Sequence, residues 1–259
     1  MAIKIVDGDI LDSGLSSIAS AIRQRGGTAA ALHFPDGMAQ AISDIPGGGD
    51  EELIGMIERS ATEITIPDGT SGIGTFAFAW YPGLESVAIP SSVTSIGSNA
   101  FQNCTSLTSI TIPDSVTSIG DDAFFNCTSL TSITIPDSVM SIGASAFEYC
   151  FSLSSVILPK YITAISNYML SDCKSLTTVT IPDSVISIGN DALGDCENLV
   201  SIVIPKSVTS IGLRAFDYDS RLQDVYYTGT EEEWNAININ STGNRYLTNA
   251  TKHFNYTPN

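Results

Sequence analysis

Hydrophobic and polar positions recur along this chain with a fixed period of 23 residues. One unit reads Leu-x-x-Ile-x-Ile-Pro-x-x-Val-x-x-Ile-Gly-x-x-Ala-Phe-x-x-Cys-x-x, and it is clearest over residues 107–129 and 130–152. A period of this length is typical of a solenoid, in which each coil buries its apolar face only against its neighbours. The pattern therefore predicts one elongated stack of coils.

Each unit predicts two short extended pieces and a turn. Ile110 and Ile112 alternate with hydroxyl residues, which is the period-two pattern of a half-buried strand. The proline that follows ends this strand because it has no N–H to donate. A second extended piece ends at Ile119, and Gly120 fits a corner that needs a positive φ. Residues 123–124 then begin a turn that points a small and a large side chain inward.

The repeat resembles the BspA-like leucine-rich repeats, a family of 23-residue units. Seven consecutive units keep the register from Ile64 to Tyr227. The resemblance implies a repeat solenoid, a slightly curved right-handed coil with one parallel β-strand from each unit on one face. Family members are mostly surface or secreted interaction proteins, and catalysis is not characteristic of the repeat. The resemblance thus implies a non-enzymatic binding or adhesion module.

The flanking sequences predict helices at the start of the chain and a cap at its end. Apolar residues at helical spacing begin at Leu15, and Pro35 opens a second helix. Thr230 and Glu233 form a Thr-x-x-Glu capping box that starts a helix beyond the repeats. The predicted organisation is a helical attachment or oligomerisation segment over 1–46, a linker and capping helix over 47–62, the solenoid over 63–227 and a C-terminal cap over 228–259.

The stretch from Leu15 to Ile45 resembles helical segments that precede repeat arrays in tail-associated proteins of phages and prophages from gut Firmicutes. This resemblance implies a phage-tail (virion) protein that recognises a host, with homo-oligomers formed through the N-terminal helices. It agrees with the first residues of the chain, which lack the charged and apolar regions of a secretory signal peptide. A bacterial cell-surface adhesin segment and a purely structural spacer are the alternatives.

Charge and hydropathy narrow the class of partner. The chain carries 28 acidic and 11 basic side chains, a net charge of −17, which argues against nucleic acid and anionic membrane surfaces because like charges repel. The longest apolar run, residues 76–81, is far shorter than the roughly 20 residues needed to cross a bilayer. We therefore expect neither nucleic-acid binding nor membrane insertion.

The cysteines and histidines give no catalytic constellation. Successive cysteines lie 23 residues apart, a spacing that matches no zinc motif, so we expect buried packing residues. Disulfides between neighbouring coils and a metal site are the alternatives. His33 and His253 lie in opposite flanks, which leaves the serines and cysteines of the repeats without an adjacent base. The sequence predicts no enzyme and no cofactor, with weak calcium binding at Asp-rich turns as a further alternative.

Departures from the consensus mark the candidate binding residues, because the common residue already satisfies folding. Tyr149 and Tyr168 replace Asn or Asp, and Tyr161 replaces Ser. Phe151 and Ile157 replace Thr. Exposed aromatic clusters often mark interaction sites, and these positions fall on different edges of the coil, so they do not form one patch. The alternative is that this unit, which also lacks the corner glycine, is irregular and repacks locally.

Outward residues of the predicted strands add rows of hydroxyl groups. These rows are either small polar fillers between stacked strands or a flat surface for a protein or glycan on a bacterial or host cell. The hydroxyl residues in the candidate binding site are Ser132, Thr134, Ser155, Thr178 and Thr180.

Overall fold

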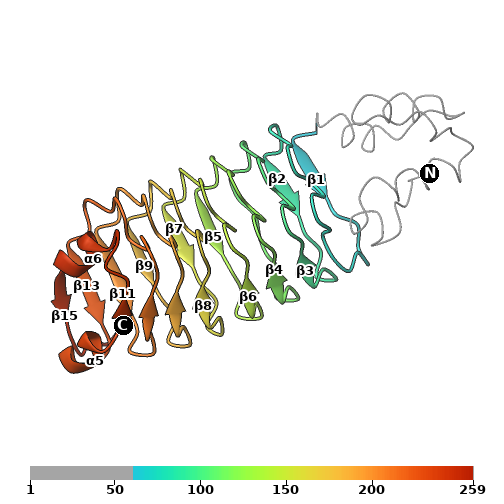
Figure 1. The fold of residues 1–259 in the computed structure, drawn as a ribbon. Coiled ribbons are helices and arrows are strands. Elements are labelled where there is room, and N and C mark those ends of the chain that lie inside the picture. The colour runs from blue at the N-terminus through green and yellow to red at the C-terminus, as the bar shows by residue number, and fades with distance from the viewer. Residues whose placement is uncertain (1–60, 259) are drawn as a thin grey trace, which may run out of the picture.

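The 23-residue period forms a coil in the computed structural model, which describes residues 61–258. The chain winds into a parallel β-solenoid of about eight turns with little helix, and successive coils stack along one axis (Figure 1). This arrangement confirms the predicted leucine-rich-repeat solenoid. The predictions for residues 1–46, and for the capping helix before residue 61, lie outside the described residues.

Two columns of short parallel strands run along the stack. Each strand pairs with its counterpart in the next coil, so that Ile133 lies opposite Val156 and Ile188 lies opposite Ile211. The first column contains β1 (Glu63–Thr65), β2 (Ser86–Ala88), β5 (Ser132–Thr134), β7 (Ser155–Ile157), β9 (Thr178–Thr180), β11 (Ser201–Ile204), β13 (Asp224–Tyr227) and β15 (Thr251–His253). The second contains β3 (Ser95–Ile96), β4 (Ser118–Ile119), β6 (Ser141–Ile142), β8 (Ala164–Ile165), β10 (Ser187–Ile188), β12 (Ser210–Ile211) and β14 (Asn238–Ile239).

The predicted strand of the clearest repeat does not form a regular ladder. Ile110 and Ile112 are buried as the alternation predicts, yet residues 107–112 form no strand. Burial of the alternating side chains therefore does not by itself give a regular strand here.

Aromatic rings stack through the centre of the first coils. Phe78, Phe101, Phe124 and Phe147 are buried, and neighbouring ring centroids lie 5.2 to 5.3 Å apart with interplanar angles of 5° to 11°. Nearly parallel rings at this spacing show that the coils lie in close register. The inward Ala-Phe turn is thus as predicted.

The cysteine column is a packing element. All five thiols are free and buried, and each Sγ donates to a backbone carbonyl 26 residues earlier at 3.1 to 3.3 Å. Burial raises the pKa of Cys150 to about 12, which suppresses the reactive thiolate. The column therefore fills the core and satisfies carbonyl groups of the preceding coil.

The corner glycines are required by close approach and not by a positive φ, so that part of the prediction was wrong. Among the described glycines, only Gly69 and Gly243 have a positive φ. A Cβ on Gly120 would lie 2.5 Å from the backbone nitrogen of Ser98, and one on Gly97 would lie 2.8 Å from the backbone of the preceding coil. Glycine lets two backbones meet at this corner.

The C-terminal cap closes the stack with two short helices, α5 (Glu231–Asn235) and α6 (Arg245–Asn249), and adds one strand to each column (Figure 1). The predicted capping box forms, because the side chains of Thr230 and Glu233 each accept from the backbone N–H of the other. Trp234 is buried and packs edge-on against Tyr227 at 5.3 Å.

Asp219 occupies the position that cysteine holds in the five preceding coils. Its side chain is buried, its Oδ1 accepts the N–H of Cys196 at 2.9 Å, and its Oδ2 has no hydrogen-bond partner among the described residues. Burial raises the pKa of this carboxyl well above its ordinary value. This part of the core therefore carries a carboxyl group that favours its neutral form, in addition to the buried thiols.

The close approach at the corner predicts the effect of a single methyl group. We expect Gly120→Ala to lower the free energy of unfolding by about 1–3 kcal/mol, the usual result of overpacking. Gly194→Ala is the comparison, and we expect it to lose less stability, since its Cβ would meet the carbonyl oxygen of Arg214 at 3.2 Å, a tight contact that is still longer than the 2.5 Å at Gly120. Urea unfolding of both variants measures the difference, and equal losses would contradict the proposed role of the corner.

The buried carboxyl predicts a pH dependence. Because the folded pKa of Asp219 is raised, its contribution to stability is full below the unfolded pKa of about 4 and is lost as the pH rises toward the folded value. We expect Asp219→Asn, which keeps the acceptor oxygen, to exceed the wild type by roughly 1–3 kcal/mol at about pH 7 and to converge with it below about pH 4. Urea unfolding across this range tests the expectation. Asp183→Asn, which removes an exposed carboxyl, is the control for the loss of one charge, and a pH slope in Asp219→Asn equal to that of the wild type would refute the assignment.

Candidate binding faces

The predicted site residues fall on separate parts of the coil. Tyr161 follows the strand of its coil and is 57% exposed. The remaining aromatic candidates lie in the turn between the second strand and the next coil. We call this surface the turn face, and it comprises residues 75–82, 98–105, 121–128, 144–151, 167–174, 190–197 and 213–220. We call the outward surface of the first-column strands the strand face, and it holds Ser132, Thr134, Ser155, Ile157, Thr178 and Thr180.

The hydroxyl groups of the strand face differ from those elsewhere on the coil. Thr117 Oγ1 donates to a carbonyl of the preceding coil at 3.1 Å, and Ser138 Oγ does so at 2.7 Å. Within residues 61–258 no such bond holds Ser132, Thr134 or Ser155, which are exposed. Thr178 does take part in a contact between coils, because its Oγ1 accepts from Ser201 Oγ at 3.4 Å. The strand face therefore presents the hydroxyl groups of Ser132, Thr134 and Ser155 to solvent, together with Ile157, which is 60% exposed.

Two backbone positions in each turn adopt the left-handed conformation. In one coil these are Asn99 and Asn103, with φ of 58° and 60°. Their N–H groups donate to carbonyls of the following coil, each at 2.8 Å. Asn and Asp tolerate this region better than other side chains. Accordingly, Asn or Asp holds about half of these positions, at Asn99, Asn103, Asp122, Asn126, Asp172, Asp191 and Asp195.

Aromatic residues occupy five of the remaining left-handed positions. A side chain in this conformation costs roughly 1–2 kcal/mol, and Phe76, Trp80 and Tyr218 are 55%, 59% and 60% exposed, so they gain little burial in return. Such strained and exposed residues point to function more than to folding. The full set is Phe76, Trp80, Tyr149, Tyr168 and Tyr218, with φ of 57° to 61°.

Sequence reasoning found Tyr149 and Tyr168 but missed the other three. Phe76 and Trp80 lie in the first described coil, where the consensus is weakest, and Tyr218 lies in the last. Alignment of the Asn and Asp positions in every coil is the signal that would have found them.

The structure brings two predicted residues together with one that was missed. Tyr149 packs edge-on against Phe125 at 5.2 Å and against Phe151 at 5.9 Å. The ammonium of Lys174 lies 5.7 Å from the centroid of the Phe151 ring. We call Phe125, Tyr149 and Phe151 the aromatic cluster. The turn face thus carries a continuous aromatic surface over two coils.

Acidic side chains surround this cluster. Burial raises the pKa of Tyr149, and the charges of Glu148, Asp172 and Asp195 raise it further. Burial also raises the pKa of Glu148, with a smaller effect from nearby acidic residues. Lys174 offsets part of this charge, since its Nζ lies 3.1 Å from Glu197 and 3.7 Å from Asp172. The aromatic cluster therefore lies in a region with an excess of acidic side chains.

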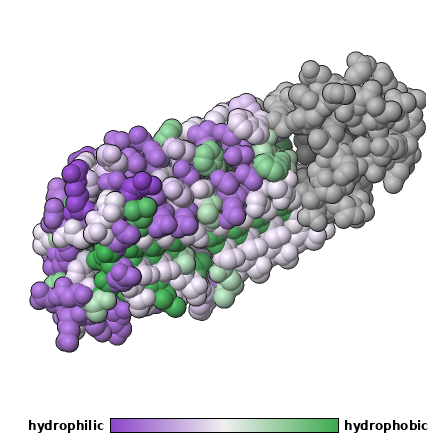
Figure 2. Space-filling view, in the orientation of Figure 1, coloured by the Kyte–Doolittle hydropathy of each residue, from purple (hydrophilic) through white to green (hydrophobic). Residues whose placement is uncertain are grey.

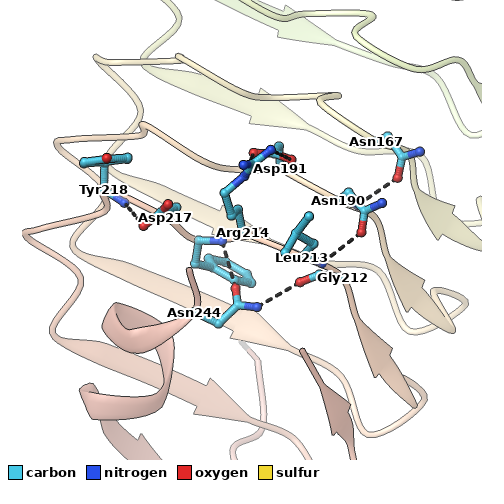
Figure 3. Close-up of polar contacts among 10 residues, drawn as sticks. Asn167, Asn190, Asp191, Gly212, Leu213, Arg214, Asp217, Tyr218 and Asn244 are labelled. Atoms are coloured by element: carbon cyan, nitrogen blue, oxygen red, sulfur yellow. Dashed lines mark hydrogen bonds and ion pairs between the residues drawn. The ribbon is translucent and has the colours of Figure 1, made fainter. Parts of the chain in front are cut away.

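Near the cap, polar side chains of the turn face satisfy one another (Figure 3). Asn167 Oδ1 accepts the N–H of Asn190 at 2.7 Å. Arg214 Nε donates to Asp191 Oδ1 at 2.8 Å, while Asn244 Nδ2 donates to the carbonyl of Gly212 at 2.8 Å. This network joins the last coils to the cap. We assign it a structural role.

The face seen in Figure 2 is mostly hydrophilic or neutral, with a narrow band of hydrophobic atoms along the coils. His253 pairs with Asp224 at 2.7 Å and stacks on Tyr226 at 4.6 Å, which fixes β15 against β13. Within residues 61–258 no three His, Cys, Asp or Glu side chains are arranged to hold a metal ion. Nor does any helix of that region reach the length and hydrophobicity that a bilayer span requires.

Comparison with protein families identifies the repeat. The model of the BspA type leucine-rich repeat region, which contains six copies, matches residues 57–174, 94–223 and 141–244. The chain belongs to the BspA-type leucine-rich repeat family. BspA-type proteins are commonly surface or binding modules and generally have no catalytic role. None of the curated proteins compared with the sequence matches it significantly.

Solved structures of bacterial leucine-rich repeat proteins share the fold. A leucine-rich cell surface protein from Faecalibacterium prausnitzii A2-165 is 28% identical, with a TM-score of 0.51 over 73% of this BspA-type chain and 65% of its own. A protein from Bacteroides ovatus ATCC 8483 is 31% identical, with a TM-score of 0.58 over 70% and 51%. One from T. pallidum is 32% identical, with a TM-score of 0.58 over 62% and 78%. The chain thus spans about half to two thirds of the first two proteins.

The left-handed backbone predicts that one exposed tyrosine is held against its conformational preference. We expect Tyr218→Asn to raise the free energy of unfolding by about 1 kcal/mol, because asparagine tolerates this conformation better. Tyr161→Asn is the matched control, since Tyr161 is similarly exposed and has no positive φ. Thermal unfolding measures both changes. A gain in the control, or none in Tyr218→Asn, would argue against stored strain.

Proposed function

We propose that this BspA-type chain is a non-enzymatic adhesion module of a bacterial cell-surface protein and that it binds its partner through the turn face. The observation that carries the proposal is the set of aromatic residues at positive φ, exemplified by Tyr149 and Tyr168. Folding favours Asn or Asp there, so the aromatic side chains need another reason to be present. Tyrosine and tryptophan are also the residue types enriched at binding hot spots.

The cell-surface setting is supported by the F. prausnitzii protein, which is described as a cell surface protein and resembles this chain in sequence and fold. The alternative is a phage-tail protein that recognises a host. That alternative, like homo-oligomer formation, rests on residues 1–46, which lie outside the described part of the chain. Detection of the protein on intact cells or in purified phage particles, with an antibody against the solenoid, distinguishes the two settings.

The strand face is a second surface for the same function. Its exposed hydroxyl groups at Ser132, Ser155 and Thr180 make no hydrogen bonds between coils within the described residues. They lie on the same outward face of the strands as Ile157. An extended face of this kind suits a flat protein or glycan. It lacks the aromatic anchors of the turn face, so we place the stronger contacts on the latter.

The proposal predicts which substitutions weaken binding. We expect Tyr149→Asn, Phe151→Thr and Tyr168→Asp, which restore residues of other coils, to weaken binding to intact cells, surface proteins or glycans at least about tenfold. The matched control is Met140→Thr with Ile186→Thr. Both residues are also exposed and apolar, at 57% and 52%, and this pair retains wild-type binding. Binding of the labelled full chain to cells and arrays is the measurement.

Two outcomes of this experiment count against the proposal. If only a strand-face variant such as Ile157→Thr loses binding, the partner contacts the strand face and the assignment to the turn face is wrong. If the wild type binds none of the cells, proteins or glycans, the chain acts as a structural spacer.

A further inference from the structure

We propose that the aromatic cluster binds an arginine- or lysine-rich segment of a partner protein. This inference rests on the proposed function and specifies the chemistry of the partner. It starts from the geometry of Phe125, Tyr149 and Phe151, whose edge-on contacts at 5.2 and 5.9 Å turn ring faces in different directions. Ring faces carry partial negative charge and attract cations that lie within about 6 Å.

Lys174 shows how the surface holds such a cation. Its ammonium lies 5.7 Å from the centre of the Phe151 ring and 3.1 Å from a carboxylate oxygen of Glu197. A ring face and a carboxylate thus hold the same alkylammonium group. We infer that a basic side chain of the partner uses this pair of contacts, either in place of Lys174 or beside it.

Charge complementarity selects a basic segment over other occupants. Glu148, Asp172 and Asp195 lie close enough to Tyr149 to act on its hydroxyl, and the whole chain has a net charge of −17. An acidic protein or a sulfated glycan would be repelled. A neutral glycan gains stacking on the rings but nothing from the carboxylates. A guanidinium or ammonium group gains from both, since charge-assisted hydrogen bonds are the stronger kind.

The test uses the full chain and a fluorescent peptide of alternating arginine and serine. A citrulline peptide of equal length keeps the size and planar shape of the side chain but removes the charge and replaces one donor nitrogen by an acceptor oxygen. At an ionic strength of about 0.15 M, we expect the arginine peptide to bind at a single site and the citrulline peptide at least about tenfold more weakly. Fluorescence anisotropy gives both dissociation constants.

Substitutions separate the aromatic contact from general charge attraction. Tyr149→Asn with Phe151→Thr leaves the net charge unchanged and should weaken binding of the arginine peptide at least about tenfold. Lys174→Gln removes the internal cation and should strengthen binding about threefold or more beyond its control. That control is Lys206→Gln, which makes the same change in charge at an exposed lysine outside the turn face.

The results that would contradict the basic-segment inference differ from those that would contradict the proposed function. Equal binding of the arginine and citrulline peptides, or unchanged binding by Tyr149→Asn with Phe151→Thr, refutes the basic-segment inference. If a neutral glycan binds, the same double variant loses it, and the arginine peptide does not bind, that inference falls while the proposed function stands. If cells, surface proteins, glycans and peptide all fail to bind the wild type, both fall.

Discussion

The stacking of each coil on a copy of itself, 23 residues away, is the constraint on which the rest of the structure depends. Every inward position must accept its own counterpart about one strand spacing away, roughly 5 Å. Phenylalanine meets this requirement because rings such as Phe101 and Phe124 lie nearly parallel at 5.2 Å. Cysteine meets it because each thiol donates to a carbonyl of the preceding coil. Glycine at the corner lets two backbones approach within a distance that excludes a Cβ.

The same constraint governs charge. A column of identical charges would place like groups side by side, and some charged positions instead pair with an opposite charge in the next coil. Asp137 pairs with Lys160 at 2.7 Å, and Asp191 pairs with Arg214 at 2.8 Å. Exposed pairs of this kind stabilise by only about 0–1 kcal/mol each, so their main effect is to avoid repulsion. Around Tyr149 the pairing is incomplete, and the excess of carboxylates there is a property that folding does not require.

Hydrogen bonds run in opposite directions on two sides of the coil, and this explains why the turn face is unusual. At the corner, the N–H of Gly120 donates to the preceding coil, to the carbonyl of Ile96. On the turn face, the N–H of Asn99 donates to the following coil. The paired left-handed positions of the turns lie on the side where the N–H groups face the following coil. An aromatic residue at such a position is costly because its side chain disfavours the left-handed backbone conformation. The preference of these positions for Asn and Asp therefore helps to identify candidate functional residues, namely the aromatic residues that depart from it.

The sequence predicted the architecture well and the site only in part, for identifiable physical reasons. Periodicity determines which side chains point inward, so the solenoid and the Ala-Phe turn could be predicted. The capping box could be predicted because the side chains that form it, Thr230 and Glu233, are three residues apart in the sequence. Glycine serves either a positive φ or a close approach, and the spacing of the coils, which decides between them at Gly120, is a property of the folded stack. The left-handed φ of the Asn and Asp columns could not be predicted, because these residue types are common in turns of every kind. Phe125 was missed because its contact with Tyr149 crosses from one coil to the next.

Rigidity links the fold to the proposed binding. The backbone of each central coil is bonded to a neighbour on both sides, so rings at positions such as Tyr149 are presented on a fixed frame. A partner that binds them needs little reordering of the module, and preorganisation of this kind reduces the entropic cost of association. The strain at the left-handed positions is present before binding and is held by the hydrogen bonds between coils. In the proposed complex, a small aromatic contact area therefore suffices for a specific interaction, because the surrounding carboxylates also attract the cationic groups of the partner.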